Sequence, residues 1–264
     1  MSNSIHPTAI VSESVELGSN VTIGPFCILD GKIKVGDGNE FKSHCVVRGR
    51  VTIGDNNRFF SFCSIGEEPQ DLTYKKEETE VIIGNNNTIR EYVSIHRGTL
   101  KQDKVTKIGD NNLLMAKVHL GHDTIIGSNC VLVNSVNIAG HVKIGNKVTI
   151  SGNSGCTQFV SIGDGVYVGA STTIDKDVPS YCTAIGNRAK LKGINIIGLR
   201  RAGFSKADIS ELVSFIRLME ASPLSPRSFV DEEEVISEYG DNDIIRTVIS
   251  EIKTSKAGII PFSR

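Results

Sequence analysis

Three histidines, an aspartate and a glutamine are spaced so that a regular repeat of the chain would bring them together. His119, His122 and Asp123 lie in the segment KVHLGHDTIIG, and His141 and Gln158 follow further along the chain. Histidine can take and return a proton near neutral pH, and a neighbouring carboxylate orients the imidazole and stabilises its charged form. If the fold brings these side chains together, they predict general acid–base chemistry.

A six-residue repeat is the element that would position them. Large apolar residues occupy every sixth position in three runs, with Cys156 as the one exception: Ile5 to Ile65, Ile83 to Ile95 and Ile108 to Ile174. An α-helix needs apolar spacings near three and four, so the repeat is not helical. Glycine and Asn-rich turns between β-branched residues predict short strands that fold at regular corners, three strands to an 18-residue coil. This pattern predicts a parallel β-helix of triangular section, in which each coil packs against its neighbours.

The dimensions of the prism follow from the number of repeats. The 26 six-residue units, three to a coil, predict roughly eight to nine coils that stack about 4.8 Å apart, for a length of about 40 Å. Loops at 67–80 and 101–107 interrupt the repeat, and loops on a rigid scaffold often hold ligands.

An 18-residue coil stacks the chemical residues in register. His122 lies under Gly140 and Gln158, Asp123 lies under His141, and His119 lies near the same corner. Gly140 has no side chain, so its backbone N–H can approach a reacting carbonyl and stabilise an oxyanion. Three imidazoles are also a known zinc ligand set, and the spacing alone does not exclude a metal site. The other histidines, His6, His44 and His96, are expected to be solvated surface residues.

The chain divides into a β-helix over residues 1–184 and a helical C-terminal domain over residues 185–264. Pro179 ends the strand pattern. Ser205 and Asp208 form an N-terminal capping signal for a helix over FSKADISELVSFIRLMEAS. Two shorter helices are expected over 226–238 and 242–254.

Composition limits the possible partners and locations. The net charge of −1 argues against a nucleic-acid partner. No apolar run is long enough to span a membrane, and the four residues before the repeat leave no room for a signal peptide, so a cytoplasmic location is expected. Cys27, Cys45 and Cys63 lie 18 residues apart, which predicts small buried thiols in one inward column. The basic segment NRAKLKGINIIGLRRAGFSK is either a solvated face or a docking surface for an acidic protein or phosphates.

The chain is similar to a known family along nearly its whole length. The motifs IHPTAIV, IGPFCI, PQDLTYKKEET, IREYVSIHRGT, NLLMAKVHLGHD, IAGHVKIG, GNRAKLKGINIIGLRRAGFS and KAGII resemble, in order, the UDP-N-acetylglucosamine O-acyltransferases of lipid A biosynthesis, of the hexapeptide-repeat acyltransferase family. The resemblance implies a left-handed β-helix and a homotrimer with active sites between prisms. It also implies transfer of a 3-hydroxyacyl chain from acyl carrier protein to the 3-hydroxyl of UDP-N-acetylglucosamine (UDP-GlcNAc), with no metal and no cofactor beyond the thioester co-substrate.

The same resemblance implies a role for each site residue. The general base is His122, supported by Asp123, and the N–H of Gly140 contacts the acyl carbonyl. The substrate-binding residues are His119, His141 and Gln158 around the base, Gln70 and Asp71 near the sugar, and Asn195 and Arg201 at the nucleotide from the adjacent subunit.

Four positions depart from the family pattern. Thr157 stands where the family commonly has histidine, Thr73 where it has lysine, and Ala202 where it has a second arginine. Ala170 stands in the acyl-chain groove where glycine is common, so we expect its methyl group to shorten the preferred acyl chain. The alternatives are an N-acyltransferase acting on a UDP-amino sugar, a zinc lyase resembling the β-helical carbonic anhydrases, and a purely structural β-helix.

Overall fold

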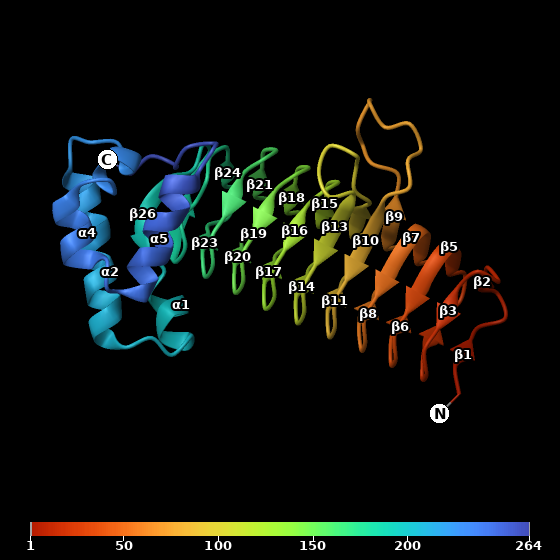
Figure 1. Ribbon diagram of the computed structural model, residues 1–264. Helices are drawn as coiled ribbons and strands as arrows, with labels where there is room; N and C mark the ends of the chain where they lie inside the picture. The colour runs from red at the N-terminus through yellow and green to blue at the C-terminus, as the bar shows by residue number, and fades with distance from the viewer. Residues whose placement is uncertain (1, 264) are drawn as a thin grey trace.

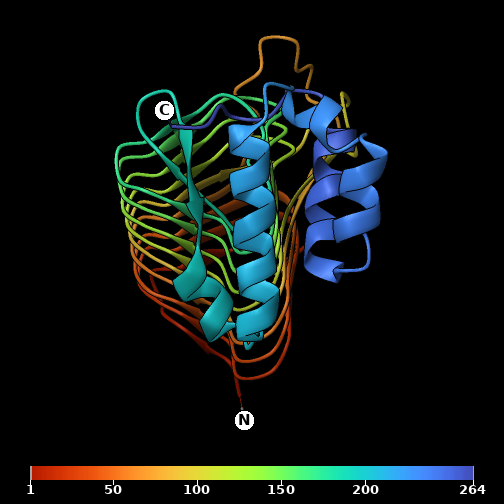
Figure 2. The ribbon, with the colours of Figure 1, turned by 90° about the vertical axis from the view of Figure 1, so that its left-hand side faces the viewer.

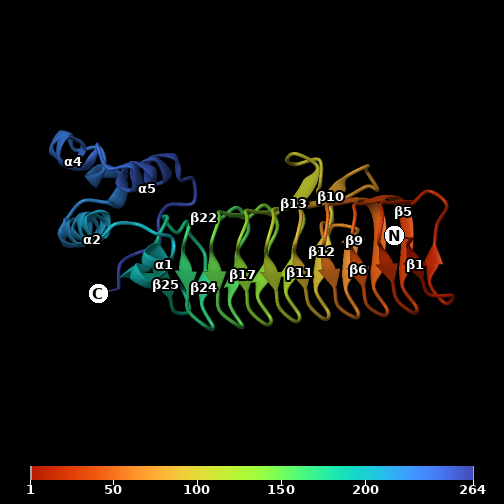
Figure 3. The ribbon, with the colours of Figure 1, turned by 90° about the horizontal axis from the view of Figure 1, so that it is seen from below.

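The chain folds as a three-sided prism of stacked coils that carries a group of helices at its C-terminal end (Figure 1). The computed structural model describes residues 2–263. Figure 2 looks at the end with the helices, where successive coils lie almost directly behind one another. Figure 3 shows the same stack from below, with the loops projecting from one side.

One face of the prism is a sheet of ten parallel rungs among the described residues, closed by one antiparallel strand. Its strands, in spatial order, are β1 (Ser4–Ile5), β4 (Thr22–Ile23), β6 (Glu40–Phe41), β8 (Arg58–Phe59), β11 (Thr88–Ile89), β14 (Leu113–Leu114), β17 (Val131–Leu132), β20 (Thr149–Ile150), β23 (Tyr167–Val168), β25 (Cys182–Ile185) and the antiparallel β26 (Lys190–Ile194).

The other two faces form a single sheet, because β5 (Ile28–Val35) and β7 (Val46–Ile53) run across the corner between them. The second face holds β2 (Ile10–Val11), β9 (Ser64–Glu67), β12 (Ser94–His96), β15 (His119–Leu120), β18 (Asn137–Ile138), β21 (Gly155–Cys156) and β24 (Thr173–Ile174). The third face holds β3 (Glu16–Leu17), β10 (Glu80–Ile83), β13 (Val105–Ile108), β16 (Ile125–Ile126), β19 (Lys143–Ile144) and β22 (Ser161–Ile162).

Up to the last coil, the register matches the predicted 18 residues wherever no loop intervenes, as between His119 and Asn137. Across the second loop Ser94 pairs with His119, an offset of 25 residues that equals one coil plus the seven residues at 101–107. The predicted parallel β-helix is confirmed, but the predicted eight to nine coils are too few. The last rung, β25, lies beyond the six-residue repeat and is reached by a shortened coil that pairs Tyr167 with Thr183.

Buried asparagines hold one corner of the prism in register. The side-chain oxygen of Asn39 accepts the N–H of Asn57 at 2.9 Å, and the oxygen of Asn57 accepts the N–H of Asn87 at 2.8 Å. Asn112 extends the ladder on the next coil. Because a buried amide must be hydrogen-bonded, each asparagine fixes the coil that follows it, including the coils on either side of the loops.

The interior of the prism is apolar and continuous. The rings of Phe41 and Phe59 stack with centroids 4.5 Å apart, and the predicted cysteine column of Cys27, Cys45 and Cys63 is buried as free thiols. A rigid, close-packed core of this kind keeps the corner residues at fixed spacing.

The C-terminal helices are α1 (Ile196–Arg201), α2 (Lys206–Ala221), α3 (Pro226–Phe229), α4 (Glu233–Tyr239) and α5 (Asp243–Thr254). The capping box predicted at Ser205 and Asp208 begins α2, and α5 lies within its predicted range. The single helix predicted over 226–238 is wrong, because the chain turns at the buried Val230 and separates α3 from α4. Helix α1 was not predicted.

Helix α5 is tied to the last coil by polar contacts. The Glu251 carboxylate accepts the backbone N–H and the hydroxyl of Ser180 at 2.7 and 2.6 Å, and the Ser255 hydroxyl donates to Asp177 at 2.6 Å. The helical group is therefore fixed on the end of the prism. Among the described residues, no helix has the length and apolar character needed to cross a membrane.

Candidate active site

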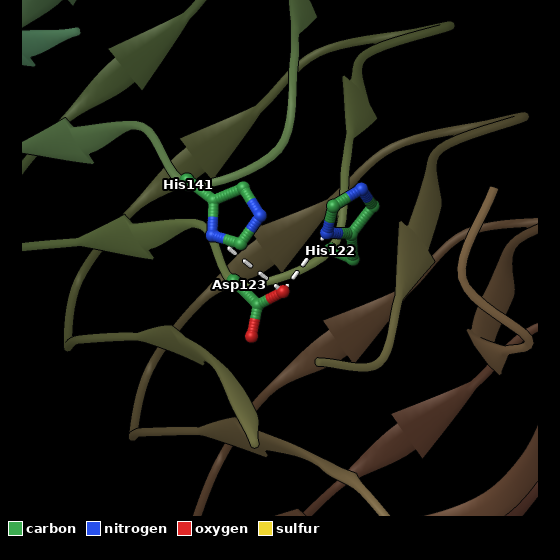
Figure 4. A group of neighbouring side chains, drawn as sticks. All are labelled: His122, Asp123 and His141. Carbon is green, nitrogen blue, oxygen red and sulfur yellow. Dashed lines mark hydrogen bonds and ion pairs between the residues drawn. The ribbon is translucent and has the colours of Figure 1, made fainter. Parts of the chain in front are cut away.

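A buried histidine and aspartate form a hydrogen-bonded pair at the corner between β15 and β16. His122 Nδ1 lies 2.8 Å from Asp123 Oδ2, and the two residues are 4% and 1% exposed. Figure 4 shows the Nδ1 atoms of His122 and His141 both turned toward the Asp123 carboxylate. With the proton on Nδ1 of His122 shared with the carboxylate, its Nε2 has a free lone pair. This arrangement suits a general base.

The Asp123 carboxylate is held by the chain that precedes the second loop. Thr99 donates its hydroxyl to Oδ2 at 2.7 Å and its backbone N–H to Oδ1 at 2.9 Å, and Thr106 accepts the backbone N–H of Asp123. Burial alone would raise the pKa of Asp123, but the hydrogen bonds from His122 and Thr99 outweigh it and hold the pKa below its usual value. The carboxylate is therefore ionised at neutral pH.

Replacing Thr99 with valine should destabilise the fold by about 1.5–3 kcal/mol near pH 7, because a hydrogen bond to a charged group is lost without a change of shape. The pKa of Asp123 in the folded protein lies below that in the unfolded chain. The contribution of Asp123 to the free energy of unfolding is therefore complete above its pKa in the unfolded chain. It is lost as the pH falls through its pKa in the folded protein. Urea unfolding between pH 7 and pH 3 should show that the difference in free energy of unfolding between wild type and Thr99→Val shrinks as the pH falls. The exposed Thr22→Val is the matched control, and a gap independent of pH would contradict the assignment.

Gly140 lies directly against the His122 ring. A Cβ atom at this position would fall 2.5 Å from Cε1 and 2.8 Å from Nε2 of His122, closer than real contacts allow. The Gly140 N–H makes no hydrogen bond to any other residue within 2–263. The predicted stacking of His122 under Gly140 is therefore present, and it leaves a donor free beside the imidazole.

His141 is stacked on the Asp123 rung, as predicted, but its nearest hydrogen-bond partner is Gln102. His141 Nδ1 lies 2.9 Å from Gln102 Oε1 and 3.8 Å from Asp123 Oδ2. Its ring stacks on Phe159 with centroids 4.5 Å apart and meets the His122 ring edge-on. Burial lowers the pKa of His141, so the ring is neutral near pH 7.

His119 lies on the second face beside His96, which was expected to be a solvated surface residue. Its Nδ1 is 2.8 Å from the Ser94 hydroxyl, and its ring meets that of His96 edge-on at 5.2 Å. His96 is half-buried and bonds the backbone oxygen of Glu68. Burial, and then the neighbouring His96, lower the pKa of His119. A polar strip therefore extends from the His122 corner toward the first loop.

The two loops meet at Asp71. Lys101 Nζ lies 2.6 Å from Asp71 Oδ2, and Thr73 donates its N–H and hydroxyl to Oδ1 at 2.8 Å each. The Lys101 ammonium, with the Thr73 hydrogen bonds, holds the pKa of Asp71 well below its usual range. Gln70, beside it, is exposed. The contact couples the first loop to the turn that also contacts Asp123 and His141.

Four predicted site residues lie away from His122 within one chain. Gln158 is exposed two coils above it, and Ala170 is exposed at a different corner, between β23 and β24. Asn195 caps α1 by accepting the Gly198 N–H and donating to the Gly165 oxygen, and Arg201 is exposed at the end of that helix. Figure 1 shows α1 near the C-terminal end of the prism, several coils from β15.

A groove of about 1000 Å³ begins beside His141. His141, Gln102 and Phe159 line one end, and the groove runs along β19 and β22 to Thr254 at the C-terminal end of α5 and to Lys256 just beyond it. A ligand lying in it would reach the His141 imidazole at one end and the helical group at the other.

His122, Asp123 and His141 place three possible ligand atoms within 4.8 Å of one another, which revives the question of a metal. A cation bound through Nδ1 of both histidines would displace the protons that the hydrogen bonds from His122 to Asp123 and from His141 to the Gln102 oxygen need. With these hydrogen bonds in place, each imidazole keeps only its Nε2 lone pair for a ligand.

Comparison with known proteins identifies the family. Residues 106–140 match the family described as bacterial transferase hexapeptide (six repeats), and residues 177–260 match Udp N-acetylglucosamine O-acyltransferase, Domain 2. The acyl-(acyl-carrier-protein) UDP-N-acetylglucosamine O-acyltransferase of Paraburkholderia phymatum is 48% identical over 97% of this chain and 98% of that protein. The chain belongs to the UDP-N-acetylglucosamine O-acyltransferase family. A protein of the same name from Aliarcobacter butzleri is 45% identical over 99% of both chains.

The fold agrees with solved structures of the UDP-N-acetylglucosamine O-acyltransferase family. The crystal structure of the Francisella novicida UDP-N-acetylglucosamine acyltransferase superposes with a TM-score of 0.91 at 36% identity, covering 97% of this chain and 94% of that one. One position that departs from the family resemblance takes part in the contact between the loops. Thr73 donates its N–H and hydroxyl to the Asp71 carboxylate, which also bonds Lys101 of the other loop.

Three site residues at the start of the second loop were not predicted: Thr99 just before it, and Lys101 and Gln102 within it. The repeat gives a signal for Thr99 alone, since the offset of 25 residues across this loop places Thr99 beside Thr124, next to Asp123. Lys101 and Gln102 lie inside the loop, where the repeat gives no register.

Proposed function

We propose that the protein transfers a 3-hydroxyacyl chain from acyl carrier protein to the 3-hydroxyl of UDP-GlcNAc, the first step of lipid A biosynthesis. The observation that carries the proposal is the 48% identity over 97% of the chain to a protein named for acyl transfer from acyl carrier protein to this sugar nucleotide. The buried His122–Asp123 pair supports it, because acyl transfer to a hydroxyl requires a base.

The acyl group then passes directly from the thioester to the sugar, without a covalent enzyme intermediate. His122 Nε2 removes the proton of the sugar hydroxyl as its oxygen attacks the thioester carbonyl, and the ionised Asp123 stabilises the imidazolium that forms. The Gly140 N–H donates to the oxyanion. When the carbon–sulfur bond breaks, the imidazolium returns the proton to the departing thiolate, which leaves an ester and a free thiol.

The remaining residues complete the proposed substrate site. His119, His141 and Gln158 bind substrate around the base, and Gln70 and Asp71 lie near the sugar. Asn195 and Arg201 act from the adjacent subunit of a homotrimer, which is supported by their distance from His122 within one chain. Ala170 borders the acyl chain. No metal or other cofactor is required, and the cytoplasmic location remains a prediction.

Single-turnover transfer from 3-hydroxyacyl carrier proteins of several chain lengths tests the proposal. We expect transfer to UDP-GlcNAc that is unchanged by EDTA. Transfer only to a UDP-3-amino sugar would replace the proposal with an N-acyltransferase. Activity that is lost to EDTA and restored by zinc would overturn the metal-free mechanism, and metal analysis of the purified protein would identify the ion.

A further inference from the structure

The Asp123 carboxylate faces two imidazoles that can compete for it. Its Oδ2 accepts from His122 at 2.8 Å and from the Thr99 hydroxyl at 2.7 Å, while His141 Nδ1 lies 3.8 Å away. A modest rotation of the His141 ring would bring a second imidazole N–H to the same oxygen. The His122 bond would then weaken, since one oxygen cannot serve every donor equally.

Gln102 prevents this competition by giving His141 another acceptor. Its side-chain oxygen lies 2.9 Å from His141 Nδ1, and the half-buried residue follows Thr99 in the same turn. The turn itself is held by the Thr99 bonds to Asp123 and by the Lys101 bond to Asp71. Gln102 is therefore presented to His141 from a fixed piece of backbone.

Resting on the proposed function, we propose that Gln102 is a positioning residue that fixes His141 as its Nδ1-protonated tautomer. His141 Nε2 then accepts a hydrogen bond from a substrate hydroxyl group, and the Asp123 carboxylate remains with His122. The hydroxyl belongs either to the sugar or to the 3-hydroxyacyl chain. His141 and Gln102 line the same end of the groove, where a ligand would meet them.

A neutral amide suits this role better than a carboxylate would. The groups whose charge acts on His141 are Asp123, His122, Lys101 and Asp71, and burial lowers its pKa despite the nearby carboxylates. An uncharged acceptor orients the ring without favouring the imidazolium, in which both nitrogens are donors. With a carboxylate at position 102, His141 would gain a proton on Nε2. That nitrogen could then no longer accept a hydrogen bond from the substrate hydroxyl.

Gln102→Ala and Gln102→Glu separate this role from simple packing. We would measure kcat, and KM for each substrate, from pH 6 to pH 8.5. Gln102→Ala should raise KM for the substrate that carries the hydroxyl by about threefold to tenfold at every pH, the equivalent of one neutral hydrogen bond. Gln102→Glu should raise the same KM about tenfold or more at pH 6 and recover toward pH 8.5, while the wild-type KM stays level. The substrate whose KM responds identifies the hydroxyl.

Asp103→Ala, an exposed position in the same turn, is the matched control and should behave as wild type. Thermal unfolding of each variant checks that the turn still folds. The inference is overturned if Gln102→Glu shows a level KM across the pH range or matches Gln102→Ala at every pH. Absence of transfer by the wild type would refute the proposed function instead, so the two failures are distinguishable.

Discussion

Replacing His122 with alanine should lower kcat for acyl transfer by a factor of about 10² to 10⁴, the usual contribution of a general base. Its Nδ1 is committed to the buried Asp123, and its Nε2 has a lone pair beside the free N–H of Gly140. Single-turnover rates with saturating substrates measure the loss directly. KM should change little, because the base acts on the transition state more than on substrate binding.

The control must separate lost chemistry from lost structure. His122 is buried, so the alanine variant is compared with His122→Gln, which fills more of the space but cannot act as a base. Both should be slow. His122→Gln should unfold near the wild-type temperature because its amide can still donate to Asp123, whereas His122→Ala loses that hydrogen bond and should unfold at a lower temperature while staying folded under assay conditions. His6→Ala, at an exposed position far from the site, should retain full activity. A His122→Ala rate within threefold of wild type would exclude the role of base.

Much of the site could be predicted because the fold is a repeat. The 18-residue coil fixes which residues stack, so the positions of Asp123 under His141 and of His122 under Gly140 follow from counting along the sequence alone. In most folds such pairs depend on long-range packing that no local pattern records. Here the spacing of apolar residues encodes both the core and the positions of the corner side chains.

The prediction failed where the repeat stops. Gln102 and Lys101 lie in the second loop, and Glu68, whose backbone oxygen bonds His96, lies in the first loop, so counting did not place them. The helical group has no repeat at all. Its long amphipathic helix α2 was predicted from its cap and apolar spacing, whereas the break at Val230 depends on which residues turn inward against the core.

Gly140→Ala should lower kcat by about 10²-fold, because a misplacement of the base by 1 Å costs about that much. Gly140 does not have the positive φ that favours glycine, so the backbone tolerates alanine. The obstacle is the His122 ring, three atoms of which would lie 2.5 to 2.9 Å from the new methyl group. The ring must therefore move away from Asp123 or from the substrate. Gly155→Ala is the control, since its nearest new contact, the Asn137 oxygen at 3.5 Å, is an ordinary one.

A double-mutant cycle shows whether the methyl group acts through the ring. If displacement of His122 is the cause, Gly140→Ala should cost little further rate in a His122→Ala background, because residues that act as a unit are not additive. Full additivity of the two losses would contradict this cause and would place the effect on the Gly140 N–H and the oxyanion it contacts. A rate for the single variant equal to that of Gly155→Ala would show that the ring can yield without loss, and the close packing of Gly140 against His122 would then have no part in catalysis.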